Sequence, residues 1–135
     1  MTFPVAEVYV LGMNVAVWIV SAVLAALYVM AGFTKVAKSK DDLLSEPRMS
    51  WVGDFSPGQI KAIGAAELAG ALGLVVPWLT GIATILTPIA AVGLALLQVG
   101  AAITHGRRGE GATVPVNLVL CALAVFVAAV RYGQV

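Results

Sequence analysis

Four long apolar stretches, separated by short polar segments, set the pattern of this sequence. No charged residue lies between Glu7 and Lys35, and residues 15–33 would form a helix of about 28 Å, long enough to cross a bilayer. The uncharged run from Leu68 to Thr104 would be about 55 Å long, so we expect residues 77–81 (PWLTG) to divide it into a helical hairpin. The pattern predicts an all-α bundle of four transmembrane helices in a single membrane domain, 1–135, with spans at about 15–36, 60–77, 82–104 and 114–131.

The first connection, residues 39–59, is too charged to span a membrane, yet it contains aliphatic and aromatic side chains. We expect a short interfacial element here, lying on the bundle or at the level of the lipid headgroups in a cytoplasmic loop. The last residues of the connection, Ser56-Pro57-Gly58-Gln59, match a helix start. The serine can cap, the proline suits the first helical position, and the glutamine completes a capping box.

Basic residues fall mostly on one side of the predicted bundle. Arg131 lies on the side of the two termini, and all the others lie on the side of the first and third connections: Lys35, Lys38, Lys40, Arg48, Lys61, Arg107 and Arg108. Because cytoplasmic loops are enriched in Lys and Arg, we expect both termini to be non-cytoplasmic. We expect an integral protein of a bacterial plasma membrane, in contact with the lipid bilayer.

The composition narrows the classes of function. The chain is 61% hydrophobic and 11% charged, and its net charge of +1 argues against a surface that binds nucleic acid. Its single cysteine, Cys121, excludes an intrachain disulfide and a CxxC site, and no metal-ligand or Ser-His-Asp spacing occurs. We therefore expect no catalytic residue and no metal site. The sequence leaves enzymatic activity open but favours a chain without independent catalysis.

Several residues are interpreted as ends and bends of the spans. Asn14 is expected to cap the first span. Pro88 is expected to kink the third, with Thr84 bonding a carbonyl that the proline leaves free. The three tryptophans are interpreted as interfacial anchors: Trp18, Trp51 and Trp78.

The second span contains one carboxylate, Glu67, inside an otherwise apolar helix. An acidic residue in a membrane is costly and usually faces a partner or a functional site. Small residues recur around Glu67 at every fourth position, a spacing typical of close helix contacts. We therefore expect this to be the central helix of the bundle, with two rows of packing residues: Ala62, Ala66 and Gly70, and beside them Ala65, Ala69 and Gly73.

Each predicted span also brings a polar residue into its cytoplasmic half. The candidate polar site consists of Lys35, Glu67, Gln98, His105 and Asn117. In one interpretation these side chains only satisfy one another, with a Lys35–Glu67 ion pair as an interhelical lock. In the other they bind a ligand or carry a proton. His105 also has a structural and a functional interpretation. It either stabilises the C-terminus of its helix through the helix dipole or acts as a proton relay.

The end of the first span reads AGFTKVAKS, a second segment reads WVGDFSPGQIKAIGAAELAGALGLVVPWLTGIA, and a third reads LTPIAAVGLALLQVGAAITHGRRGE. In order and spacing these segments resemble the DoxX-like family of small four-span membrane proteins, over about Tyr28–Arg131. The most recognisable positions are Ala31, Gly32 and Lys35, then Glu67, and His105 before a basic loop. The resemblance implies a four-helix membrane bundle. It also implies relatives that are linked to quinone-reducing or thiol-stress membrane complexes, and distant animal relatives that act as receptor-assembly chaperones.

Two classes of function remain open. The first, which the sequence favours, is a non-catalytic accessory or assembly subunit that docks on a larger, redox-linked membrane complex. Its partner would be another membrane protein or a second copy of the chain. The second is a quinone- or lipid-binding redox subunit, with Lys35, Glu67 and His105 around a headgroup in the cytoplasmic half. The sequence fixes no cofactor, and a quinone is the one that the second class implies.

Overall fold

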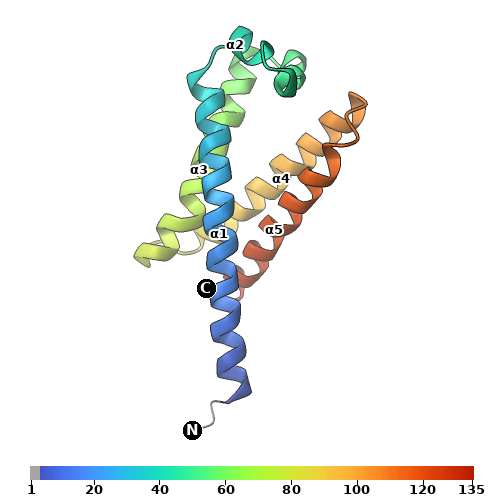
Figure 1. The fold of residues 1–135 in the computed structure, drawn as a ribbon. Helices are drawn as coiled ribbons and strands as arrows, with labels where there is room; N and C mark the ends of the chain where they lie inside the picture. Colours follow the sequence, from blue (N-terminus) through green and yellow to red (C-terminus); the bar gives the residue numbers. More distant parts are fainter. Residues whose placement is uncertain (1–3) are drawn as a thin grey trace.

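The four apolar stretches form four long helices in the computed structural model, which describes residues 4–135 (Figure 1). These helices are α1 (Val5–Ala37), α3 (Pro57–Thr80), α4 (Leu86–Arg107) and α5 (Val114–Tyr132). All four are long and apolar enough to cross a membrane, and no strand occurs among residues 4–135. The prediction of an all-α four-helix membrane bundle is confirmed, and the chain is an integral membrane protein.

The helices form two antiparallel pairs, α1 with α3 and α4 with α5 (Figure 1). A contact between α3 and α4 joins the pairs, and a smaller one lies between α1 and α5. Figure 1 shows the pairs close together near the C-terminus and apart at the opposite end of the bundle. This divergence leaves space between the pairs at one end only.

The first connection covers that open end. It forms the short helix α2 (Lys40–Leu44) and the 3-10 helix η1 (Pro47–Asp54). Leu43, Val52 and Ile60 make a small buried core that attaches both elements to the start of α3. The predicted capping box is confirmed, because Ser56 Oγ accepts from the Gln59 amide at 3.2 Å and Gln59 Oε1 accepts from the Ser56 amide at 2.9 Å.

Helix α1 begins at Val5, ten residues before the expected start of the first span. The expectation that Asn14 caps this helix is therefore wrong. No proline separates Val5 from Asn14, and the helix continues through Glu7 and Gly12. The 33 residues of α1 make a helix of about 50 Å, longer than the roughly 30 Å of bilayer hydrocarbon.

The hairpin between α3 and α4 lies a few residues later than the sequence pattern indicated. Helix α3 continues through Pro77 to Thr80, and Gly81 ends it in the left-handed conformation, with φ of 71°. Pro88 lies in the first turn of α4, where a missing amide hydrogen is tolerated, so the expected kink bonded by Thr84 is wrong. Pro77 has no amide hydrogen to donate to the carbonyl of Gly73, and Thr87 Oγ1 of α4 donates to it instead, at 2.8 Å.

Glycines set the closest helix contacts. A Cβ added at Gly64 would lie 2.8 Å from Lys35 Cβ and 2.9 Å from the Gly32 carbonyl oxygen, so α1 and α3 touch there through their backbones. Between α3 and α4, a Cβ at Gly70 would meet Leu94 Cδ2 at 2.6 Å, and one at Gly73 would meet a Cβ of α4 at 2.6 Å. Helix α3 is thus in contact with helices on both sides.

The small-residue rows agree with these contacts only in part. Gly70 is buried and Gly73 is partly buried against α4, but the alanines are exposed on the outer side of α3: Ala62, Ala65, Ala66 and Ala69. Packing of these four alanines within the bundle was expected and is wrong. The exposed alanines lie on the side of the helix opposite its buried face, which consists of Ile60, Gly64, Glu67, Gly70, Ala71, Leu74 and Pro77.

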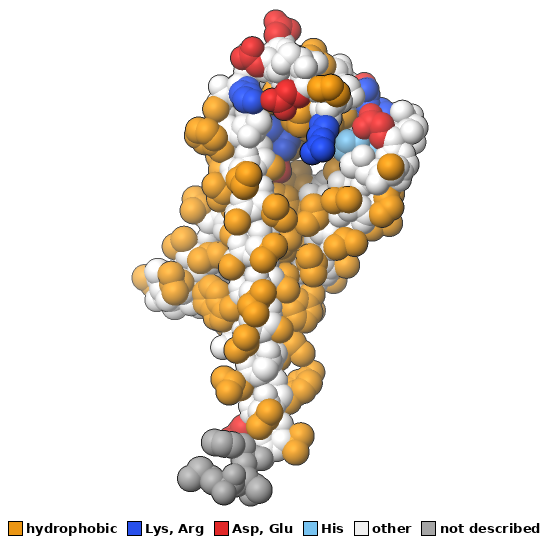
Figure 2. Space-filling model, in the orientation of Figure 1, with side chains coloured by type: hydrophobic (Ala, Val, Ile, Leu, Met, Phe, Trp, Pro, Cys, Tyr) orange, Lys and Arg blue, Asp and Glu red, His pale blue; other side chains and the backbone are white. Residues whose placement is uncertain are grey.

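Charged side chains gather at the end formed by α2 and η1, and hydrophobic side chains cover the flanks of the helices (Figure 2). We predict that this end is cytoplasmic, because Lys and Arg are retained on that side of a membrane. A reporter fused after Val135 should read as non-cytoplasmic and one inserted at Gly106 as cytoplasmic. Finding both reporters on the same side of the membrane would contradict this topology.

Candidate functional site

The structure brings all five candidate polar residues to one cavity of about 620 Å³. The cavity lies between the two helix pairs, beneath η1. Each of the five residues is buried, with exposed fractions of 6–8% for the whole residue. The predicted residues that line the cavity are Lys35 of α1, Glu67 of α3, Gln98 and His105 of α4, and Asn117 of α5.

Lys35 and Glu67 form the charged part of the wall. Lys35 Nζ lies 2.7 Å from Glu67 Oε1, and the two side chains are only 10% and 8% exposed. The Cβ atom of Lys35 packs directly against Gly64, so the close contact between α1 and α3 places the Lys35 side chain inside the bundle. The two charged atoms are close, but the geometry of the ion pair does not form a well-aligned hydrogen bond to Glu67 Oε1 within residues 4–135.

A chain of hydrogen bonds between neutral side chains runs from α5 through α4 to α1. Asn117 Nδ2 donates to Gln98 Oε1 at 2.9 Å, and Gln98 Nε2 donates to Tyr28 Oη at 2.8 Å. Asn117 Oδ1 is buried and has no partner in the described part of the chain. Sequence reasoning missed Tyr28. Its position seven residues before Lys35, on the same face of a helix, is the signal that could have found it.

His105 connects the cavity with the loop that follows α4. Its Nδ1 donates to Glu110 Oε2 at 2.8 Å, and the other oxygen of Glu110 accepts from Arg108 Nε. Arg108 also donates to Asp54 Oδ1 of η1 at 2.8 Å. The hydrogen bonds from Arg108 and then from His105 lower the pKa of the Glu110 carboxyl, which keeps it ionised. These hydrogen bonds connect the loop after α4 to η1.

Aromatic side chains close the end of the cavity next to η1. The Trp51 ring lies edge-on to His105, with centroids 6.2 Å apart, and 5.7 Å from Lys35 Nζ. Phe55 packs edge-on against Trp51 at 5.7 Å. Trp51, interpreted as an interfacial anchor, is thus also part of the cavity wall. The rest of the wall is mostly apolar and includes Leu27, Ala31, Ile63, Leu96, Leu97, Ala101, Val116 and Leu120.

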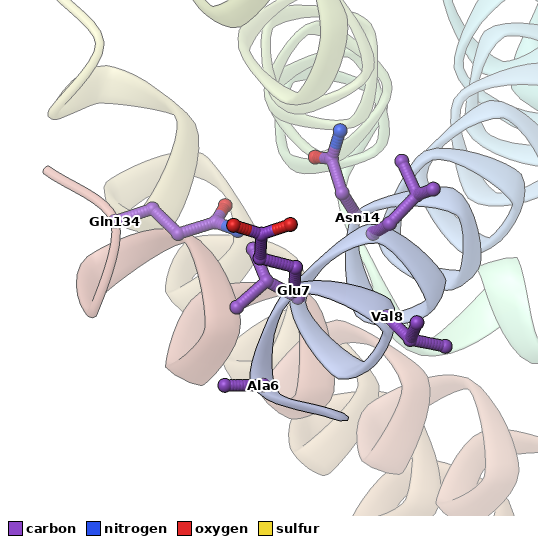
Figure 3. Close-up of a pocket in the computed structure, with 7 residues that line it drawn as sticks. Ala6, Glu7, Val8, Asn14 and Gln134 are labelled. Carbon is purple, nitrogen blue, oxygen red and sulfur yellow. The ribbon is translucent and has the colours of Figure 1, made fainter. Parts of the chain in front are cut away.

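The other two tryptophans surround a buried arginine at the far end of the bundle. The guanidinium of Arg131 lies 4.9 Å from the Trp18 ring and 4.3 Å from the Trp78 ring. Arg131 is fully buried and donates to Asn14 Oδ1 at 3.1 Å. Beside it, Gln134 and the first turns of α1 line a second, largely apolar hollow of about 630 Å³ (Figure 3); the lining residues of α1 are Ala6, Glu7, Val8, Val10, Leu11 and Asn14.

A family model described as the DoxX-like family matches residues 19–127. The chain belongs to the DoxX-like family. The matched range contains every residue that lines the cavity between the helix pairs, so the cavity lies within the part shared with the family. No curated protein and no solved structure matches this DoxX-like chain.

Proposed function

We propose that this DoxX-like chain is a membrane subunit that binds a lipid-soluble small molecule with a polar ring headgroup, of the quinone class. The observation that carries the proposal is the cavity of about 620 Å³, with buried polar groups at one side and aliphatic side chains elsewhere. Ligand sites typically occupy about 300–1,000 Å³ and combine an apolar wall with a few convergent polar groups.

The chemistry of the wall favours an amphipathic ligand. The ammonium of Lys35 and the hydroxyl of Tyr28 can donate hydrogen bonds, and the carboxylate of Glu67 can accept them. Trp51 offers an aromatic surface at the same end. Leu27, Leu96 and Leu120 provide contacts for a hydrocarbon tail.

The shape of the bundle favours entry from the lipid phase. The contact between α1 and α5 is small, and the surface is hollowed between α1 and the α4–α5 pair, beneath the charged end (Figure 2). Hydrophobic side chains cover this flank, whereas η1 lies over the end of the bundle. A ligand that is soluble in the bilayer can approach such an opening without crossing a charged surface.

Titration of the purified protein in lipid nanodiscs with decylubiquinone tests the proposal. We expect saturable quenching of Trp51 fluorescence, because Trp51 lines the cavity while Trp18 and Trp78 lie beside Arg131 at the far end. Ala101→Phe should fill the cavity without removing a polar group and weaken binding at least about tenfold, a free-energy loss of about 1.4 kcal/mol.

The matched control is Ala69→Phe, which adds the same volume to the exposed side of α3 and should leave the titration unchanged. Equal binding by wild type and Ala101→Phe would overturn the proposal. A chain that binds no quinone, but co-purifies from native membranes with one larger complex, would instead support the accessory or assembly role. The exposed row of small residues on α3, including Ala62 and Ala66, favours that second candidate, because it would let another helix approach closely.

A further inference from the structure

The 3-10 helix η1 forms the wall of the cavity at its polar end. Met49 and Trp51 of η1, and Phe55 directly after it, line the cavity, and η1 lies over the end of the bundle where the helix pairs diverge (Figure 1). We propose that η1 seals this end of the cavity from water and that Arg108 holds it against the α4–α5 pair. This inference rests on the proposed function, because it concerns access to the same cavity.

The attachment of η1 to the α1–α3 pair is apolar and buried. Val52 of η1 packs with Leu43 of α2 and Ile60 of α3, and all three side chains are almost completely shielded from solvent. Lys40 Nζ also donates to the carbonyl oxygen of Phe55 at 2.7 Å. Because aliphatic side chains as buried as these are costly to expose to water, η1 is firmly attached on this side.

The attachment of η1 to the α4–α5 pair is polar and depends on one residue. Arg108 Nη1 donates to Asp54 Oδ1 at 2.8 Å, and Arg108 Nη2 donates to Ser50 Oγ at 3.4 Å. Within residues 4–135, no other hydrogen bond joins η1 to α4, α5 or the loop between them. The side chains of Arg108 and Asp54 are 26% and 49% exposed, and ion pairs this exposed contribute little to stability. We therefore expect η1 to separate from the bundle on this side.

Arg108 holds a second part of the same wall. Its Nε donates to Glu110, whose other carboxylate oxygen accepts from His105 Nδ1. One guanidinium is thus bonded both to η1 and to the carboxylate that positions a residue of the cavity. Loss of Asp54 should release η1 and leave the bonds between Arg108, Glu110 and His105 in place, whereas loss of Arg108 would disturb both parts of the wall. Asp54 is therefore the better position for a test.

The reaction of a reporter cysteine with a charged, water-soluble thiol reagent tests the inference. Ala101→Cys places the reporter on the cavity wall, in a chain whose single cysteine, Cys121, is replaced by alanine. The protein is reconstituted in phosphatidylcholine nanodiscs and treated with a trimethylammonium methanethiosulfonate, whose permanent charge keeps it out of the lipid. We expect the reporter to react at least about tenfold more slowly than a cysteine at the exposed Gly106, because η1 closes the aqueous route.

Asp54→Ala combined with Ser50→Ala should release η1 without changing a residue that lines the cavity. The reporter should then react at least about threefold faster, because the rate follows the population in which η1 is detached. Asp54→Asn keeps an acceptor for Arg108 but loses the charge, so it should give a smaller increase. The matched control is Glu46→Ala, which removes a similarly exposed ion pair with Lys38 on the side held by the buried core, and the rate should not change.

A second reporter separates release of η1 from general loosening of the bundle. Ala124 is completely buried among the four long helices, so Ala124→Cys should remain unreactive in every variant. If Ala124→Cys reacted faster together with the reporter at Ala101, the bundle as a whole would have opened, and the inference would be overturned. Equal melting temperatures of the variants provide an independent check of the fold.

The remaining outcomes distinguish this inference from the proposal on which it rests. An unchanged rate at Ala101→Cys after loss of Asp54 and Ser50 would overturn the role of Arg108. A reporter that reacts as fast as Gly106→Cys while η1 is intact would show that η1 does not seal the cavity. In both cases, binding of decylubiquinone would leave the ligand cavity standing. Faster reaction after release of η1, in a chain that binds no decylubiquinone, would support the seal and overturn the proposed function.

Discussion

Replacing Lys35 with methionine is expected to lower the free energy of unfolding by about 3–5 kcal/mol, because it leaves Glu67 without a counter-charge. The pair lies 2.7 Å apart with both side chains about nine-tenths buried, so solvent screens it little. Glu67→Gln should have a similar effect through the orphaned ammonium. Chemical unfolding of the purified protein in detergent micelles measures both changes.

The double variant Lys35→Met with Glu67→Gln should recover much of this loss, since neither charge is then left unpaired. If the loss in the double variant instead equals the sum of the losses in the two single variants, the residues are not coupled. Lys38→Met provides the matched control. Its ion pair with Glu46 has the similar length of 2.8 Å, but both side chains are nearly half exposed, so we expect little change in the free energy of unfolding.

The same double variant also separates the two interpretations of the pair. If it regains stability and still binds decylubiquinone, the ion pair is an interhelical lock. If it is stable but no longer binds the quinone, the two residues belong to the ligand site. The exposed Lys38 variant should bind normally in either case, because Lys38 does not line the cavity.

Gly64→Leu is the second substitution with a large expected effect, a loss of about 3 kcal/mol. A Cβ at this position would lie 2.8 Å from Lys35 Cβ and 2.9 Å from the Gly32 carbonyl oxygen, so α1 and α3 must move apart. That movement also draws Lys35 away from Glu67. We therefore expect both a lower melting temperature in detergent and weaker quinone binding.

Gly93→Leu is the control for this prediction. Gly93 lies on the exposed side of α4 with no atom within 4 Å of an added Cβ, so leucine should be tolerated there or should slightly stabilise the helix. A Gly64→Leu variant as stable as wild type would show that α1 and α3 can separate without cost. The close contact would then not set the position of Lys35.

Local patterns in the sequence predicted the features that depend on local physics. The long apolar runs identified four helices, and the spacing of Ser56 and Gln59 identified the capping box, because both signals act within a few residues. The polar residue that each span brings toward the same side also indicated which groups could meet. Whether Lys35 and its neighbours bind a ligand remains a proposal.

Features that depend on tertiary structure could not be read in the same way. The spacing of small residues on α3 fits two faces equally well, and only the positions of α1 and α4 decide that Gly70 is packed while Ala62 is exposed. The partnership of His105 with Glu110 depends on the path of a short loop. Arg131 looked like the end of a span, but two tryptophans from other helices bury it.

The buried Arg131 has a mechanical consequence for the whole bundle. Its guanidinium contacts Trp18 of α1 and Trp78 of α3 from its place on α5, and it is bonded to Asn14 of α1. The two helix pairs are therefore fastened to each other at the end remote from the cavity and diverge at the other. In such an arrangement any change of angle at the fastened end would become a larger change in width at the level of Glu67, so the contacts of Arg131 would help to set how wide the cavity is.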